Sequence, residues 1–127
     1  MTQAEYDSWL LKVSENGMEI ANVPEQTEEL CIAAVKKNPW ALRLVKEQTE
    51  EICLTAVGSF GLVLSLVKEK TPAVIKAAIK QNGMSLQHVP EELRTEEICF
   101  EAIRNHPDAI RFVQDPAPEL STRCLAP

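Results

Sequence analysis

Cysteines and paired glutamates are the residues of this 127-residue chain whose types and spacing could do chemistry. They occur together in a five-residue string, in which threonine and two glutamates precede a branched aliphatic residue and cysteine. The string is present three times, at residues 27–31, 49–53 and 95–99. Thiolates bind zinc, and paired carboxylates can act as general acid and base. The pattern therefore raises two hypotheses, a metal site and a catalytic centre.

The regular register of Cys31, Cys53 and Cys99 argues against a shared metal ion. Packed helices lie about 8–10 Å apart axis to axis, and equivalent residues of successive helices are spaced similarly. Because a zinc–sulfur bond is about 2.3 Å long, such a row cannot converge on one ion. Trp9 and Ile75 occupy the same position in sister copies, as expected for packing residues. We therefore predict buried cysteines, no bound metal and no cofactor.

A fourth cysteine, Cys124, lies outside this row and near the end of the sequence. No two cysteines are close enough in sequence to suggest a disulfide framework. Two interpretations of Cys124 stay open, an exposed thiol that links two chains under oxidation and a tail residue without a function.

The histidines and glutamates do not form a catalytic pattern. His88 and His106 occupy different repeat positions and have no serine, cysteine or acid at the spacing of a nucleophile and its base. The glutamate pair of each repeated string directly follows a threonine, where it would complement the dipole of a helix N-terminus. Asn82-Gly83 lacks the preceding strand and the further glycines of a phosphate-binding loop. We therefore predict that the chain is not an enzyme.

The elements that position these residues are predicted to be helices. A fourth copy of the string begins at Thr71, so the copies start 22, 22 and 24 residues apart, and a fixed period of this size indicates a repeat array. Each threonine suits the N-cap of a helix whose apolar residues follow at helical spacing. Asparagine with glycine or proline then ends that helix, and at Asn82-Gly83 we expect a left-handed glycine at the helix C-cap. A short second helix would follow.

These observations predict an all-α fold, a short α-solenoid of two-helix repeats of about 22–24 residues each. A composition of 45% hydrophobic and 5% aromatic residues suits closely packed helices. The expected units are residues 5–26, 27–48, 49–70, 71–94 and 95–115, and the tail 116–127 resembles an incomplete sixth unit.

The combination of Thr-Glu-Glu-(Ile/Leu)-Cys, Ala-(Val/Ile), Asn-Gly or Asn-Pro and Val-Pro-Glu resembles the tandem helical repeats of the domain of unknown function 4116 family. The resemblance covers nearly the whole chain and implies helical repeats without a known activity or catalytic residue. Some residues depart from the pattern. Trp9 and Ile75 replace the cysteine, and Asp108 stands where the other units have Met18, Trp40, Leu62 and Met84.

Charge and hydropathy narrow the possible partners and locations. The net charge of -6 disfavours nonspecific binding to nucleic acid or to anionic membranes. The sequence lacks an apolar run of about 18–20 residues and a signal-peptide pattern at its start, so we expect a cytoplasmic protein. A basic protein partner fits this charge better.

The leading hypothesis is a non-catalytic protein–protein interaction module. Two neighbouring columns of varied residues are expected to face outward, one running Ala21, Arg43, Ser65, Gln87 and Arg111, the other Asn22, Leu44, Leu66, His88 and Phe112. Aromatic residues and arginine are the favoured anchors of interfaces. The candidate partner-binding residues are Trp40, Arg43, Phe60, Gln87, His88, Arg111 and Phe112.

An acidic inhibitor that imitates nucleic acid and blocks a basic groove on its partner is the alternative. RNA reading by helical repeats would need a basic surface and stacking residues at one repeat position, and the column that begins at Ala21 supplies neither a basic surface nor a row of stacking residues.

The C-terminal end of the array raises the question of self-association. Ile110, Phe112 and Val113 would be incompletely covered there, which predicts a weak homodimer through this end. Alternatively the chain is a monomer, in which Leu120 and Leu125 fold back over the same face.

Overall fold

The structure, a computed structural model, describes residues 1–113, and these residues form helices without any strand. The α-helices are α1 (Gln3–Glu15), α2 (Glu28–Lys37), α3 (Glu50–Ser59), α4 (Pro72–Gln81) and α5 (Glu96–Asn105). Each is followed by a six-residue 3-10 helix: η1 (Gly17–Asn22), η2 (Pro39–Leu44), η3 (Gly61–Leu66), η4 (Gly83–His88) and η6 (Pro107–Phe112). One further 3-10 turn, η5 (Glu91–Leu93), lies in the loop before α5. The predicted all-α fold is confirmed.

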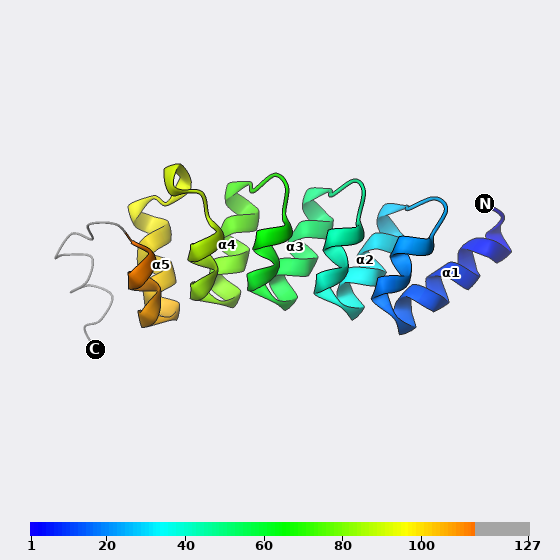
Figure 1. Cartoon of the computed structure of the whole chain (residues 1–127), viewed down its shortest axis with the longest axis horizontal. Helices are drawn as coiled ribbons and strands as arrows, with labels where there is room; N and C mark the ends of the chain where they lie inside the picture. Colours follow the sequence, from blue (N-terminus) through cyan, green and yellow to red (C-terminus); the bar gives the residue numbers. More distant parts are fainter. Residues whose placement is uncertain (114–127) are drawn as a thin grey trace.

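The helix pairs stand side by side in one row, in the order of the sequence (Figure 1). Each α-helix contacts the α-helices before and after it, and the 3-10 helices η1, η2, η3, η4 and η6 contact one another in the same order. Within residues 1–113, no element contacts a unit beyond its immediate neighbour. The molecule therefore has two layers, an α layer and a 3-10 layer, and each unit can change its outer residues without disturbing distant units.

The predicted threonine N-caps are confirmed. Thr27 Oγ1 accepts a hydrogen bond from the Leu30 amide at 3.2 Å, and Thr49, Thr71 and Thr95 cap their helices in the same way. The first helix differs because Thr2 is its N-cap, so α1 begins before residue 5 and is longer than the others. The sequence signal at the other four helix starts is the threonine followed by acids or proline.

The prediction of a left-handed glycine at the helix end was wrong. The C-cap of α4 is Asn82, whose backbone is extended, with φ -156° and ψ 112°. Gly83 lies against α5 of the next unit, where an added Cβ would collide with the carbonyl oxygen of Ala102. Glycine is needed here because the neighbouring helix approaches closely, and Gly61 meets Ala78 in the same way.

The short second helices are 3-10 rather than α-helices, and this decides which residues face outward. In a 3-10 helix, residues i and i+3 lie on the same face because there are three residues per turn. The first and fourth residues of η3, Gly61 and Leu64, are buried, whereas the second and fifth, Leu62 and Ser65, lie on the opposite, more exposed face. The same division holds in η1, η2 and η4, apart from a half-buried Pro39.

Glutamines at the end of two units tie neighbouring units together, and the sequence patterns did not identify them. Gln26 donates its Nε2 hydrogen bonds to the carbonyl oxygens of Ile20 and Leu44, at 3.1 and 3.0 Å, so it spans two units. Its Oε1 accepts from the Lys46 amide at 2.9 Å. Gln48 makes the equivalent three bonds one unit further along. These bonds fix the register in which the units stack.

Candidate protein-interaction surface

The second and fifth residues of the 3-10 helices define one surface, which we call the outward 3-10 surface. Its members are Met18, Trp40, Leu62, Met84 and Asp108 in one column, and Ala21, Arg43, Ser65, Gln87 and Arg111 in the other. All five residues of the second column are exposed, as predicted. The adjacent column was predicted to face outward as well, but only Asn22 is exposed, while Leu44, Leu66, His88 and Phe112 are half-buried. The 3-10 geometry explains this correction, because the sixth residue turns toward the neighbouring unit.

Trp40 is the most prominent apolar residue of this surface. It is the second residue of η2, and its side chain is 43% exposed. The Asn38 side chain accepts a hydrogen bond from the Trp40 amide at 3.0 Å, and Pro39 restricts the preceding backbone. The indole packs edge-on against Phe60, with ring centroids 5.6 Å apart and an interplanar angle of 67°. Trp40 is therefore held in place while a large part of it remains open to a partner.

Phe60 was expected on the surface, and the structure places it half-buried between units. It stands where three other units have an asparagine that caps the following 3-10 helix. Phe60 makes no such side-chain bond. This unit thus lacks a capping hydrogen bond of about 0.5–2 kcal/mol, and in its place the Trp40 ring gains an aromatic neighbour.

Arg43 shares the outward face of η2 with Trp40, because the two residues are three positions apart. It is exposed and makes no hydrogen bond or ion pair with any residue that the structure describes. Its guanidinium group is therefore available for a carboxylate or a backbone carbonyl of a partner.

The other predicted residues lie on η4 and η6. Gln87 is exposed and donates to the Met84 carbonyl oxygen at 3.0 Å. The Arg111 guanidinium lies over the Phe112 ring, 5.5 Å from its centroid. His88 is half-buried, and burial, followed by the nearby positive charge of Lys70, lowers the pKa of its imidazole. The structure therefore brings Trp40 near Phe60 and Arg111 near Phe112, and η3 and η4 lie between η2 and η6.

Sequence reasoning missed three apolar members of this surface, Met18, Leu62 and Met84. Each is half-buried and stands at the Trp40 position of its own unit. Together with Trp40 they form an apolar row across four units, a length that one partner segment could follow. The signal that would have found them is a period of three inside the second helices, which distinguishes a 3-10 helix from an α-helix.

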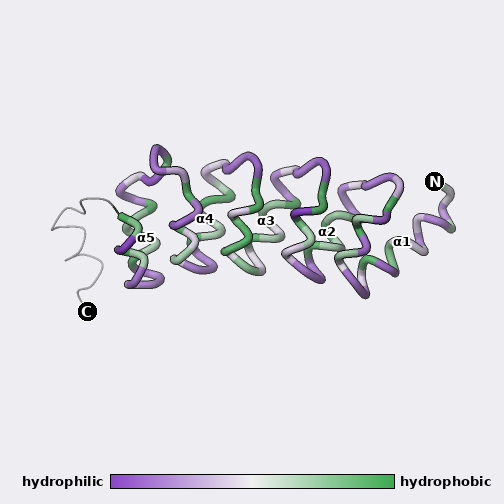
Figure 2. Tube along the Cα trace, viewed as in Figure 1, coloured by the Kyte–Doolittle hydropathy of each residue, from purple (hydrophilic) through white to green (hydrophobic). Residues whose placement is uncertain are grey.

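Negative charge is concentrated along the edge of the molecule formed by the inter-unit loops and the N-termini of the α-helices. We call residues 24–29, 46–51, 68–73 and 90–97 the loop edge; it carries eleven acidic and four basic residues. Figure 2 shows these loops as hydrophilic segments along one long side. Some acids have a structural role, since the Thr49 hydroxyl donates to Glu28 at 3.1 Å and the Thr71 hydroxyl to Glu50 at 2.9 Å.

The three cysteines of the repeat are buried side chains of the α layer. The Cys31 thiol lies 3.8 Å from Gln26 Oε1, and the Cys53 thiol 3.7 Å from Gln48 Oε1. Burial, and then the charges of Glu28 and Glu50, raise the pKa of these two thiols, so both remain protonated at neutral pH. Within residues 1–113, no group of three or more histidines, cysteines or acids is placed to hold a metal ion.

At the C-terminal end, Ile110 and Val113 are half-buried. The predicted roles of Leu120, Cys124 and Leu125 lie outside the described residues. The proposed contact between two chains at this end therefore stays a prediction.

Residues 73–115 match the model of a family described as a domain of unknown function (DUF4116). The match covers α4 except its first residue, η4, η5, α5 and η6, which are two of the five units and include the longest loop. No curated protein and no solved structure matches the chain. Among the described helices, none has the length and apolar character required to cross a membrane.

Proposed function

We propose that this chain is a non-catalytic protein-interaction module of the cytoplasm and that its outward 3-10 surface binds another protein. The observation that carries the proposal is the Trp40 indole, 43% exposed yet packed against Phe60 and placed beside the unpaired Arg43. Tryptophan and arginine are the residues most often found at the energetic centre of protein interfaces.

The arrangement of Trp40 also lowers the cost of binding. A side chain that is already fixed loses less conformational freedom when a partner covers it, and each ordered side chain otherwise costs about 0.5–1.5 kcal/mol. The neighbouring Met18, Leu62 and Met84 extend the apolar contact along the row. Methionine adapts its shape to different surfaces, so this row suits a partner segment that crosses several units.

A second candidate function is supported by the loop edge. Eleven acids against four bases along one side would attract a basic groove, as a small acidic inhibitor of a nucleic-acid-binding protein would do. Part of this charge already serves the helix N-termini, so we place this function second.

Capture experiments with matched variants distinguish the two surfaces. Extract of the source cells is passed over the wild-type chain, a Trp40→Ala/Arg43→Ala variant, and a Glu47→Gln/Glu51→Gln/Glu69→Gln variant. Leu11→Ala is the control, since Leu11 is 62% exposed on α1 and belongs to neither surface. Bound proteins are identified by mass spectrometry at low salt and at roughly 0.5 M salt, where the Debye length falls to a few ångströms.

The proposal expects a partner that stays bound to the wild-type chain at high salt and fails to bind only the Trp40→Ala/Arg43→Ala variant. The acidic inhibitor would be favoured instead if the partner were released at high salt and failed to bind only the Glu47→Gln/Glu51→Gln/Glu69→Gln variant. Equal capture by all four chains would contradict both.

A further inference from the structure

The loop before α5 is longer than the loops at the other junctions, and this changes the packing of the α layer. Three residues separate Val45 from Thr49 and Val67 from Thr71, whereas five separate Val89 from Thr95. The additional length forms the turn η5, whose Leu93 is 38% exposed. Arg94 anchors the end of this loop by donating to the carbonyl oxygens of Val89 and Phe112, at 2.8 and 2.6 Å.

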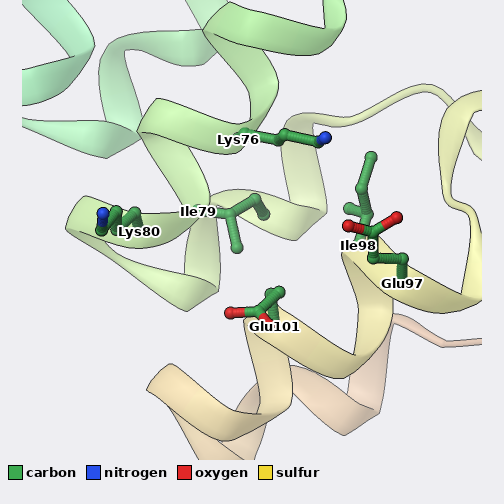
Figure 3. A pocket seen from close by; sticks show the side chains of 6 residues that line it. All are labelled: Lys76, Ile79, Lys80, Glu97, Ile98 and Glu101. Atoms are coloured by element: carbon green, nitrogen blue, oxygen red, sulfur yellow. The ribbon is translucent and has the colours of Figure 1, made fainter.

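A groove lies between α4 and α5 at this junction. It has a volume of about 300 Å³ and is lined by Lys76, Ile79, Lys80, Glu97, Ile98 and Glu101 (Figure 3). A smaller hollow of about 240 Å³ shares Lys76, Glu97 and Ile98 and continues toward Leu93. Ile98 is 8% exposed, whereas its equivalent in α3, Ile52, is 1% exposed. Ile98 is therefore more exposed than its equivalent in α3, and Leu93 adds most of the exposed apolar surface at this junction.

The two walls of the groove carry opposite charges at helical spacing. Lys76 and Lys80 are four residues apart on α4, and Glu97 and Glu101 are four residues apart on α5. Figure 3 shows Ile79 and Glu101 projecting toward each other from the two helices. Within residues 1–113, no lysine–glutamate pair comes within the 4.0 Å of an ion pair, so all four charges are open to a ligand.

We propose that this groove binds an amphipathic helix of a partner protein. The apolar stripe of that helix contacts Leu93 and the exposed edge of Ile98, acidic residues along one flank face Lys76 and Lys80, and basic residues along the other flank face Glu97 and Glu101. A groove between two side-by-side helices accepts the ridge of a third, and charges spaced one turn apart on both walls match charges spaced one turn apart on the ligand. The site lies in the α layer and is separate from the outward 3-10 surface.

Fluorescence anisotropy with synthetic helical peptides tests this proposal on the full chain. Three labelled peptides share one length and one leucine stripe, and they differ in their flanks, which are mixed (acidic on one side and basic on the other), all acidic, or all basic. The mixed peptide should bind the wild-type chain about tenfold more tightly than either of the others, because only it matches both walls.

Charge reversal of one wall provides the matched comparison. In Lys76→Glu/Lys80→Glu both walls are acidic, so the mixed peptide should lose about tenfold in affinity while the all-basic peptide gains. Lys36→Glu/Lys37→Glu makes the same charge change at the end of α2, away from the groove, and should leave the mixed peptide's affinity unchanged. Circular dichroism of both variants verifies that they fold.

Equal binding of the three peptides would overturn the proposal, as would equal losses in the two double variants. Neither result would bear on Trp40, since the peptide assay does not involve the outward 3-10 surface.

Discussion

The side-chain oxygen of Gln48 accepts a hydrogen bond from the Lys68 amide, 2.9 Å away in the next unit. Gln26 has the same relationship to Lys46. At the third junction the corresponding residues are Lys70 and Pro90, and proline has no amide hydrogen to donate. Lys70 instead donates to the Val67 carbonyl oxygen of its own unit, at 2.8 Å. A glutamine acceptor is therefore present at the two junctions where the facing lysine has an amide hydrogen to donate. It is absent at the junction where the facing residue is proline.

This relationship predicts a large effect of removing one glutamine. Gln48→Leu leaves the Lys68 amide and the Leu42 and Leu66 carbonyl oxygens without their side-chain partner. Each such bond contributes about 0.5–1.5 kcal/mol, and the bonds to Leu42 and Leu66 are partly buried, so we expect the free energy of unfolding in urea to fall by about 1–3 kcal/mol. Gln87→Leu is the control, because Gln87 is exposed and makes one local bond. Equal losses in the two variants would show that Gln48 does not hold the units together.

The threonine caps give a second stability prediction. Thr49→Ala removes the acceptor of the Ile52 amide and the donor to Glu28, and should cost about 0.5–2 kcal/mol in urea denaturation. Thr49→Ser keeps the hydroxyl and should retain most of the stability. If serine and alanine had the same effect, the methyl group rather than the cap would be responsible.

Stability should depend on pH through His88. Burial and Lys70 lower its pKa in the folded chain, whereas the unfolded chain has the ordinary value of about 6.5. Between these two values the unfolded chain binds more protons, so the free energy of unfolding falls as the pH decreases through this range. Urea midpoints at pH 7.5 and 5.5 measure the effect. His88→Gln should reduce this pH dependence, and an unchanged slope would assign it to other groups.

The state of the cysteines is testable with a thiol reagent. In a Cys124→Ser background, the buried, protonated Cys31 and Cys53 should react many times more slowly with Ellman's reagent in the folded chain than in urea. Purified protein should also contain no stoichiometric zinc. One zinc per chain, or unfolding on addition of a chelator, would revive the metal-site hypothesis.

Local patterns made the helices and their starts predictable, because a threonine cap and apolar spacing are encoded within a few residues. The glutamine bonds and the packing reason for Gly83 were not predictable, since both depend on how closely the next unit approaches. The surface was predicted in part. Arg43 and Gln87 were placed correctly, but His88 and Phe112 turned inward because the second helices have three residues per turn.

The role of Trp40 as the binding anchor is tested most directly by calorimetry with the partner recovered from the capture experiment. Trp40→Ala should weaken binding by about 2 kcal/mol or more, a loss of roughly thirtyfold, while Leu11→Ala binds as the wild type does. The loss should persist at roughly 0.5 M salt, because it comes from apolar contact rather than from charge. Equal affinities of the Trp40→Ala variant and the wild type, with both chains folded, would contradict the account.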